Sequence, residues 1–63
     1  MRETLGMKIK VARIRKQLTQ YKLGLMVGEP AYSICRYETN KAIPSPDTLA
    51  KIKQALGLGA SVN

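Results

Sequence analysis

The spacing of apolar residues predicts helices along most of this chain. Leu5, Ile9 and Ala12 follow one another at intervals of four and three residues, which places them on one face of a helix. Lysine and arginine occupy many of the other positions in the same stretch. We therefore expect an amphipathic helix at about residues 2–16, with its apolar face against a core.

A second helix is predicted at about residues 20–27. Thr19 is a favoured N-cap, because its hydroxyl can accept a hydrogen bond from a free backbone N–H group. Leu23 and Val27 form an apolar pair at i, i+4 behind it. Gly24, in the middle of this helix, costs about 1 kcal/mol relative to alanine, so we expect another helix to pass close to it.

Glycine and proline mark the boundary between the second helix and a third. Gly28 is expected to end the second helix in the left-handed conformation. Pro30 suits the first turn of a helix, which predicts a third helix at about residues 30–37. Ile34 and Tyr37 are expected to face inward from it.

A fourth helix is expected at about residues 46–56. The sequence Ser45-Pro46-Asp47 offers an N-cap, a proline at the first helical position and an acid in the first turn. The inward-facing residues of this helix are Leu49, Ile52, Ala55 and Leu56. Residues 1–63 are therefore predicted to form a single all-α domain, a compact unit of four to five helices.

The charge of the chain indicates a polyanionic partner. Eleven lysines and arginines stand against four aspartates and glutamates, which gives a net charge of +7. Such a balance attracts DNA, RNA or an anionic membrane surface. The alternative is that the charge only keeps a small protein in solution.

Composition argues against several other classes of protein. There is no histidine, the acids are dispersed and Cys35 is the single cysteine, so we expect neither an enzyme nor a metal or cofactor site. A disulfide scaffold is excluded for the same reason. No signal peptide and no membrane-spanning run is found, which predicts a cytoplasmic protein of a bacterial or phage-infected cell. Cys35 is either a small half-buried residue or a redox-sensitive thiol.

Two short helices joined by a glycine-containing turn are typical of a helix-turn-helix. With this unit, the chain resembles the Cro and phage-repressor type of helix-turn-helix proteins, the XRE family, over residues 5–58. The resemblance is carried, in register, by Leu5-Gly6, Ile9, Arg13, Leu18-Thr19-Gln20, Leu23, Gly28, Ile34, Glu38, Lys41, Pro44, Leu49, Ile52 and Ala55-Leu56. It implies a lambda-repressor-like fold and sequence-specific binding of double-stranded DNA.

The resemblance also implies which residues contact DNA. The second helix of the unit would enter the major groove and present its outer face to base edges. The expected DNA contacts are Gln20, Ala31, Tyr32, Ser33, Arg36, Asn40 and Lys41. Arg36 can donate to guanine O6 and N7, although a phosphate contact or simple solvation is the alternative. For Tyr32 the alternative is a partly buried surface aromatic residue.

Two further residues are expected to hold the unit together. The resemblance implies that Arg13 pairs with Glu38 and braces the motif from behind. Four positions depart from the family pattern: Glu29 replaces an apolar residue, Pro30 a serine or threonine cap, Gly24 the usual alanine, and Gln17 a frequent glycine. We expect Glu29 either to act as the cap itself or to face the DNA.

The function predicted from the sequence is that of a transcriptional regulator, a repressor that binds a palindromic operator as a homodimer. The apolar residues assigned to the dimer contact are Ile43, Pro44, Leu58 and Val62. Three alternatives remain open. The chain could be the antitoxin subunit of a toxin–antitoxin pair, a protein-interaction module that does not bind DNA, or a peripheral membrane binder through its first helix.

Overall fold

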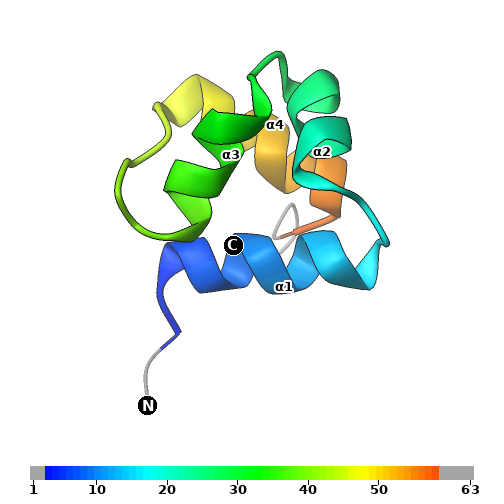
Figure 1. Ribbon diagram of the computed structural model, residues 1–63, viewed down its shortest axis with the longest axis horizontal. Helices are drawn as coiled ribbons and strands as arrows, with labels where there is room; N and C mark the ends of the chain where they lie inside the picture. The colour runs from blue at the N-terminus through cyan, green and yellow to red at the C-terminus, as the bar shows by residue number, and fades with distance from the viewer. Residues whose placement is uncertain (1–2, 59–63) are drawn as a thin grey trace.

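The protein folds as four helices arranged around one core (Figure 1). The structure, a computed structural model, describes residues 3–58. The helices are α1 (Leu5–Arg15), α2 (Gln20–Val27), α3 (Ala31–Glu38) and α4 (Pro46–Leu56). Both α1 and α2 pack against α3 and α4. The all-α fold expected from the sequence is therefore confirmed.

Hydroxyl side chains define the starts of three of these helices. Thr19 Oγ1 accepts the backbone N–H of Lys22 at 2.9 Å, and the hydroxyl of Ser45 caps α4 in the same way. Thr4 Oγ1 accepts the N–H of Met7 at 3.1 Å. Because Thr4 is the N-cap, α1 begins at Leu5 and not at residue 2 as predicted.

The third helix begins one residue later than expected. Pro30 has φ −70° and ψ 159°, an extended conformation, so it is the N-cap of α3 and not its first helical residue. The fixed φ of proline suits both positions, and only ψ distinguishes them. Glu29 does not cap the helix, since its Oε2 accepts the hydroxyl of Thr48 at 3.5 Å. Its carboxylate is thus directed toward α4.

The core is built from aliphatic residues of all four helices. Its buried members are Ile9, Leu23, Val27, Ile34, Ile52 and Leu56, and Ala12, Leu18, Tyr37, Ala55 and Leu58 pack against them. Leu5, expected in the inner stripe, is 37% exposed because it lies in the first turn of α1. Gln17 takes the left-handed conformation, with φ 58°, at the position where the family often has glycine.

Close backbone approach explains the glycine in the middle of α2. A β-carbon on Gly24 would collide with the carbonyl oxygen of Glu29, in the turn that leads into α3. The element that approaches is therefore this turn and not a helix. A β-carbon on Gly6 would likewise lie 2.5 Å from the carbonyl oxygens of Tyr37 and Glu38. Gly24 thus lets the turn pack tightly against α2, and Gly6 lets α1 pack tightly against the end of α3.

Gly24→Ala is expected to destabilise the domain, although alanine is the better helix former. The added methyl group must displace the backbone at Glu29, and overpacking of this kind costs about 1–3 kcal/mol. Thermal unfolding followed by circular dichroism measures the change, about 4–8 °C per kcal/mol for a domain of this size. Lys22→Ala, at an exposed position of the same helix, is the control. A melting temperature that rises in Gly24→Ala would contradict the packing argument.

Candidate nucleic-acid interface

A buried ion pair joins α1 to the end of α3. Arg13 Nε donates to Glu38 Oε2 at 2.6 Å, and Arg13 Nη2 donates to Glu38 Oε1 at 3.1 Å. The two side chains are only 11% and 2% exposed. A bidentate pair of this kind fixes direction as well as distance. The C-terminal end of α3 is therefore held at one angle to α1.

The same carboxylate also binds α2. Gln20 Nε2 donates to Glu38 Oε1 at 3.1 Å, and Arg13 Nη1 donates to the carbonyl oxygen of Leu18 at 2.6 Å. The Glu38 carboxylate thus connects three helices, and Arg13 also binds the loop between α1 and α2. Gln20, expected at a DNA phosphate, uses one amide hydrogen within the protein. Gln20 therefore helps to position α3 through its hydrogen bond to Glu38.

The outer face of α3 presents polar side chains to solvent. Tyr32 is 69% exposed and Arg36 lies one helical turn further on, also exposed, so the two are neighbours on one face. Ala31 and Ser33 are half-buried beside them, and Cys35 is exposed. Arg36 Nη2 donates to the carbonyl oxygen of Lys41 at 3.3 Å. This contact directs the guanidinium toward the loop after α3.

Tyr37, on the opposite side of α3, packs against the core. Partial burial raises the pKa of its phenol above the usual 10.0, and the charges of Glu29 and Tyr32 add to this effect. The hydroxyl is therefore neutral at physiological pH. The inner and outer faces of α3 thus differ clearly, with Tyr37 and Ile34 inward and Tyr32 and Arg36 outward.

Asn40 has a structural contact that the sequence did not predict. Its Oδ1 accepts the backbone N–H of Gly6 at 3.1 Å, and its Nδ2 donates to Thr4 Oγ1 at 3.0 Å. The residue takes the left-handed conformation, with φ 61°. Its side chain therefore joins the end of α3 to the start of α1, and its expected contact with DNA stays a prediction. Lys41 beside it remains exposed.

The four residues assigned to a dimer contact lie in different environments. Ile43 is 85% exposed, in the connector between α3 and α4. Pro44 is buried, so its ring offers no surface to a second copy. Leu58 is half-buried against the core, because the chain turns back after α4. Val62 lies outside the described residues.

Other kinds of site find no support in the part of the chain that the structure describes. Within residues 3–58, no three histidine, cysteine or acidic side chains gather as metal ligands would. None of the described helices combines the length and the apolarity needed to cross a bilayer.

The fold, the exposed face of α3 and the brace behind it define a class of protein. The chain belongs to the helix-turn-helix family of DNA-binding domains, whose sequence pattern matches residues 9–62. A structural relative is the P22 c2 repressor, solved in complex with a synthetic operator, with a TM-score of 0.88 and 26% identity. The match covers 90% of this chain and 86% of that one. The resemblance to phage repressors seen in the sequence is therefore confirmed.

Two relatives found by sequence similarity are named as multiprotein-bridging factors and not as repressors. Multiprotein-bridging factor 1 of Candida albicans is 42% identical over 55 residues, which is 87% of this chain and 36% of that protein. Multiprotein-bridging factor 1a of Arabidopsis thaliana is 44% identical over 46 residues, or 73% of this chain and 32% of that protein. This chain thus spans about a third of the length of these relatives. Both relatives are eukaryotic, so a bacterial or phage-infected host remains a prediction.

Proposed function

We propose that this domain binds specific sequences of double-stranded DNA and acts as a transcriptional regulator. The observation that carries the proposal is the outer face of α3, where exposed Tyr32 and Arg36 stand one turn apart on a helix fixed by the buried Arg13–Glu38 pair. A helix held in this way can enter the major groove without losing its orientation. The net charge of +7 attracts the phosphate backbone.

Each residue of the interface has a role that follows from its chemistry. Arg36 donates to guanine O6 and N7 at a base edge. Tyr32 donates to a base or phosphate, or packs on a thymine methyl group, and Ala31 and Ser33 line the groove beside it. Lys41 contacts phosphate from the loop after α3. Gln20 contacts phosphate from the first turn of α2 while it holds Glu38.

Dimeric binding to a palindromic operator completes the proposal. One half-site supplies few base contacts, each worth about 1–3 kcal/mol, and a second copy doubles them. Half-sites one turn of DNA apart, roughly 34 Å, suit such a pair of domains. Among the described residues assigned to the dimer contact, Ile43 is the most exposed. A dimer on an operator would act as a repressor by blocking polymerase.

Titration with a mixed-sequence DNA duplex tests the electrostatic part of the proposal. Fluorescence anisotropy at several salt concentrations is expected to show a log–log slope of about −0.9 for each phosphate that the protein neutralises. A linear, steep loss of affinity with salt supports DNA binding. Affinity that is weak and independent of salt would contradict it.

A second candidate function is that of a protein-interaction module. The names of the matching relatives describe factors that bridge several proteins, and most of this chain matches a part of each of them. A module of this kind needs a surface for a protein partner in addition to, or in place of, the outer face of α3. DNA binding that is weak and independent of salt in this titration would favour a module that acts in place of DNA binding.

A further inference from the structure

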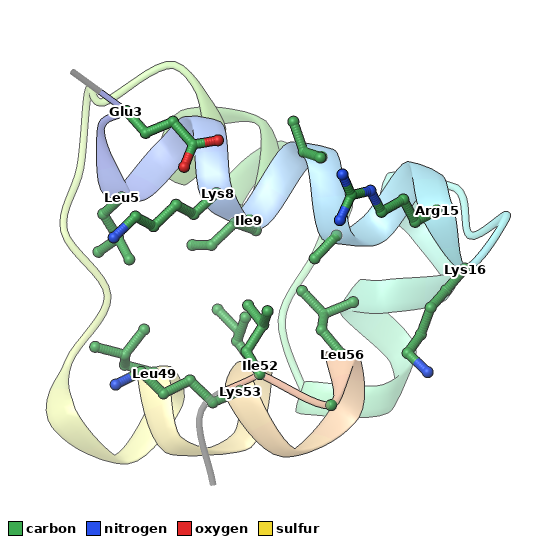
Figure 2. A pocket seen from close by; sticks show the side chains of 14 residues that line it. Glu3, Leu5, Lys8, Ile9, Arg15, Lys16, Leu49, Ile52, Lys53 and Leu56 are labelled. Carbon is green, nitrogen blue, oxygen red and sulfur yellow. The ribbon is translucent and has the colours of Figure 1, made fainter. Parts of the chain in front are cut away.

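A groove runs between α1 and α4, on a part of the molecule that the DNA interface does not use (Figure 2). Its volume is about 860 Å³. The apolar floor is formed by Ile9, Ala12, Ile52 and Leu56, with Leu5 and Leu49 toward one end. None of the residues assigned to DNA contacts lines it. The groove is therefore separate from the DNA-contacting face of α3, although Leu58, assigned to the dimer contact, also lines it.

The rim of this groove is strongly basic. Lys8 comes from the α1 wall and Lys53 from the α4 wall, and both are exposed (Figure 2). Arg15 and Lys16 follow at the C-terminal end of α1. Four cations thus surround an apolar floor, against one acid among the lining residues, Glu3. Such a combination is complementary to an occupant that is apolar along one stripe and negatively charged beside it.

We propose that the groove between α1 and α4 binds an acidic amphipathic helix of a partner protein. A helix of this kind places apolar residues at i, i+3, i+4 and i+7 into a groove formed by two other helices. The walls α1 and α4 have 11 residues each, so they extend for about 16 Å, which matches three turns of a partner helix. The proposal develops the second candidate function by naming its surface and the chemistry of its partner.

Charge argues against other occupants. A second copy of this chain carries the same net charge of +7 and would be repelled by the basic rim. A nucleic acid backbone would neutralise the rim but has no apolar side chains for the floor. An acidic amphipathic helix satisfies both parts of the groove.

Titration with a designed peptide tests the proposal. The probe is a helical peptide of four to five turns, with leucine along one stripe and glutamate elsewhere, and binding is followed by anisotropy and by methyl NMR of the protein. We expect binding that shifts the methyl signals of Ile9, Ile52 and Leu56. A peptide of the same composition with the leucines shuffled, and one with lysine in place of glutamate, are expected to bind about tenfold more weakly or not at all.

Charge-reversed variants provide matched controls. Lys8→Glu combined with Lys53→Glu is expected to weaken peptide binding about tenfold, because the new glutamates on the rim repel the glutamates of the peptide. Lys10→Glu combined with Lys51→Glu makes the same charge change on the same helices, at exposed positions that do not line the groove. This control is expected to change the affinity for the peptide by no more than about twofold. Circular dichroism checks that all variants stay folded.

Several results would overturn the groove proposal. Equal affinities for the shuffled and the striped peptide would show that only net charge matters and that the apolar floor is not used. NMR shifts confined to α3 would show that the peptide occupies the DNA interface. Sedimentation of the free domain as a dimer whose formation blocks the peptide would identify a second copy as the occupant. The residues that line the groove differ from those assigned to DNA contacts. The peptide titration and the DNA titration can therefore fail independently of each other.

Discussion

Glu38→Ala is expected to lower the free energy of unfolding by about 3–5 kcal/mol, the usual cost of removing one partner from a buried ion pair. The substitution leaves the guanidinium of Arg13 buried without its carboxylate and the side chain of Gln20 without its acceptor. A domain of this length has roughly 3–9 kcal/mol of total stability. Much of the Glu38→Ala protein is therefore expected to be unfolded at 25 °C.

Urea denaturation followed by circular dichroism measures this change. Glu29→Ala is the matched control, because it removes the same charge from a half-buried position whose one side-chain hydrogen bond, to Thr48, is long. We expect it to cost less than about 1 kcal/mol. Equal urea midpoints for the two variants would show that the Arg13–Glu38 pair does not hold the fold together.

Arg36→Ala is expected to leave the fold intact and to weaken binding to a specific DNA site by about 1–3 kcal/mol, which is roughly 5- to 150-fold. The side chain is exposed, and its one internal hydrogen bond, to the carbonyl oxygen of Lys41, lies at the surface. Its loss should therefore change DNA recognition much more than stability.

Comparison with Lys53→Ala separates recognition from charge. This control removes the same charge from α4, at an exposed position on the rim of the groove. Arg36→Ala is expected to reduce the preference for guanine at one position of the site, whereas Lys53→Ala should change neither the sequence preference nor, by more than a few-fold, the affinity. If both variants lose affinity equally and keep the same preference, Arg36 acts only as a charge.

The helices could be predicted because their signals are local. Apolar spacing located α2 and α4, with capping residues directly before each one. The predicted start of α1, at residue 2, was too early. Thr4 is the N-cap of this helix, and the charged residues before it were wrongly included in the helix. For α3, Pro30 fits both the N-cap and the first helical position, so sequence alone could not choose between them.

The site could be predicted only in part, because several contacts join residues far apart in the chain. The amide oxygen of Asn40 accepts the backbone N–H of Gly6, 34 residues away, a contact that no local pattern predicts. Gln20 likewise reaches Glu38 across 18 residues. The resemblance to a family could indicate the Arg13–Glu38 pair, whereas the groove between α1 and α4 depends on how two helices pack. Such a surface arises from three-dimensional packing and has no local pattern in the sequence.

In vitro selection of bound duplexes from a random DNA pool, at two salt concentrations, tests the central claim most directly. If α3 contacts base edges and two domains bind together, the selected duplexes share a palindromic motif with half-sites about one helical turn apart. Affinity for that motif should fall as salt rises while the preference for it remains. A pool without an enriched motif, together with binding that is lost at physiological salt, would contradict the account and leave only non-specific attraction to DNA.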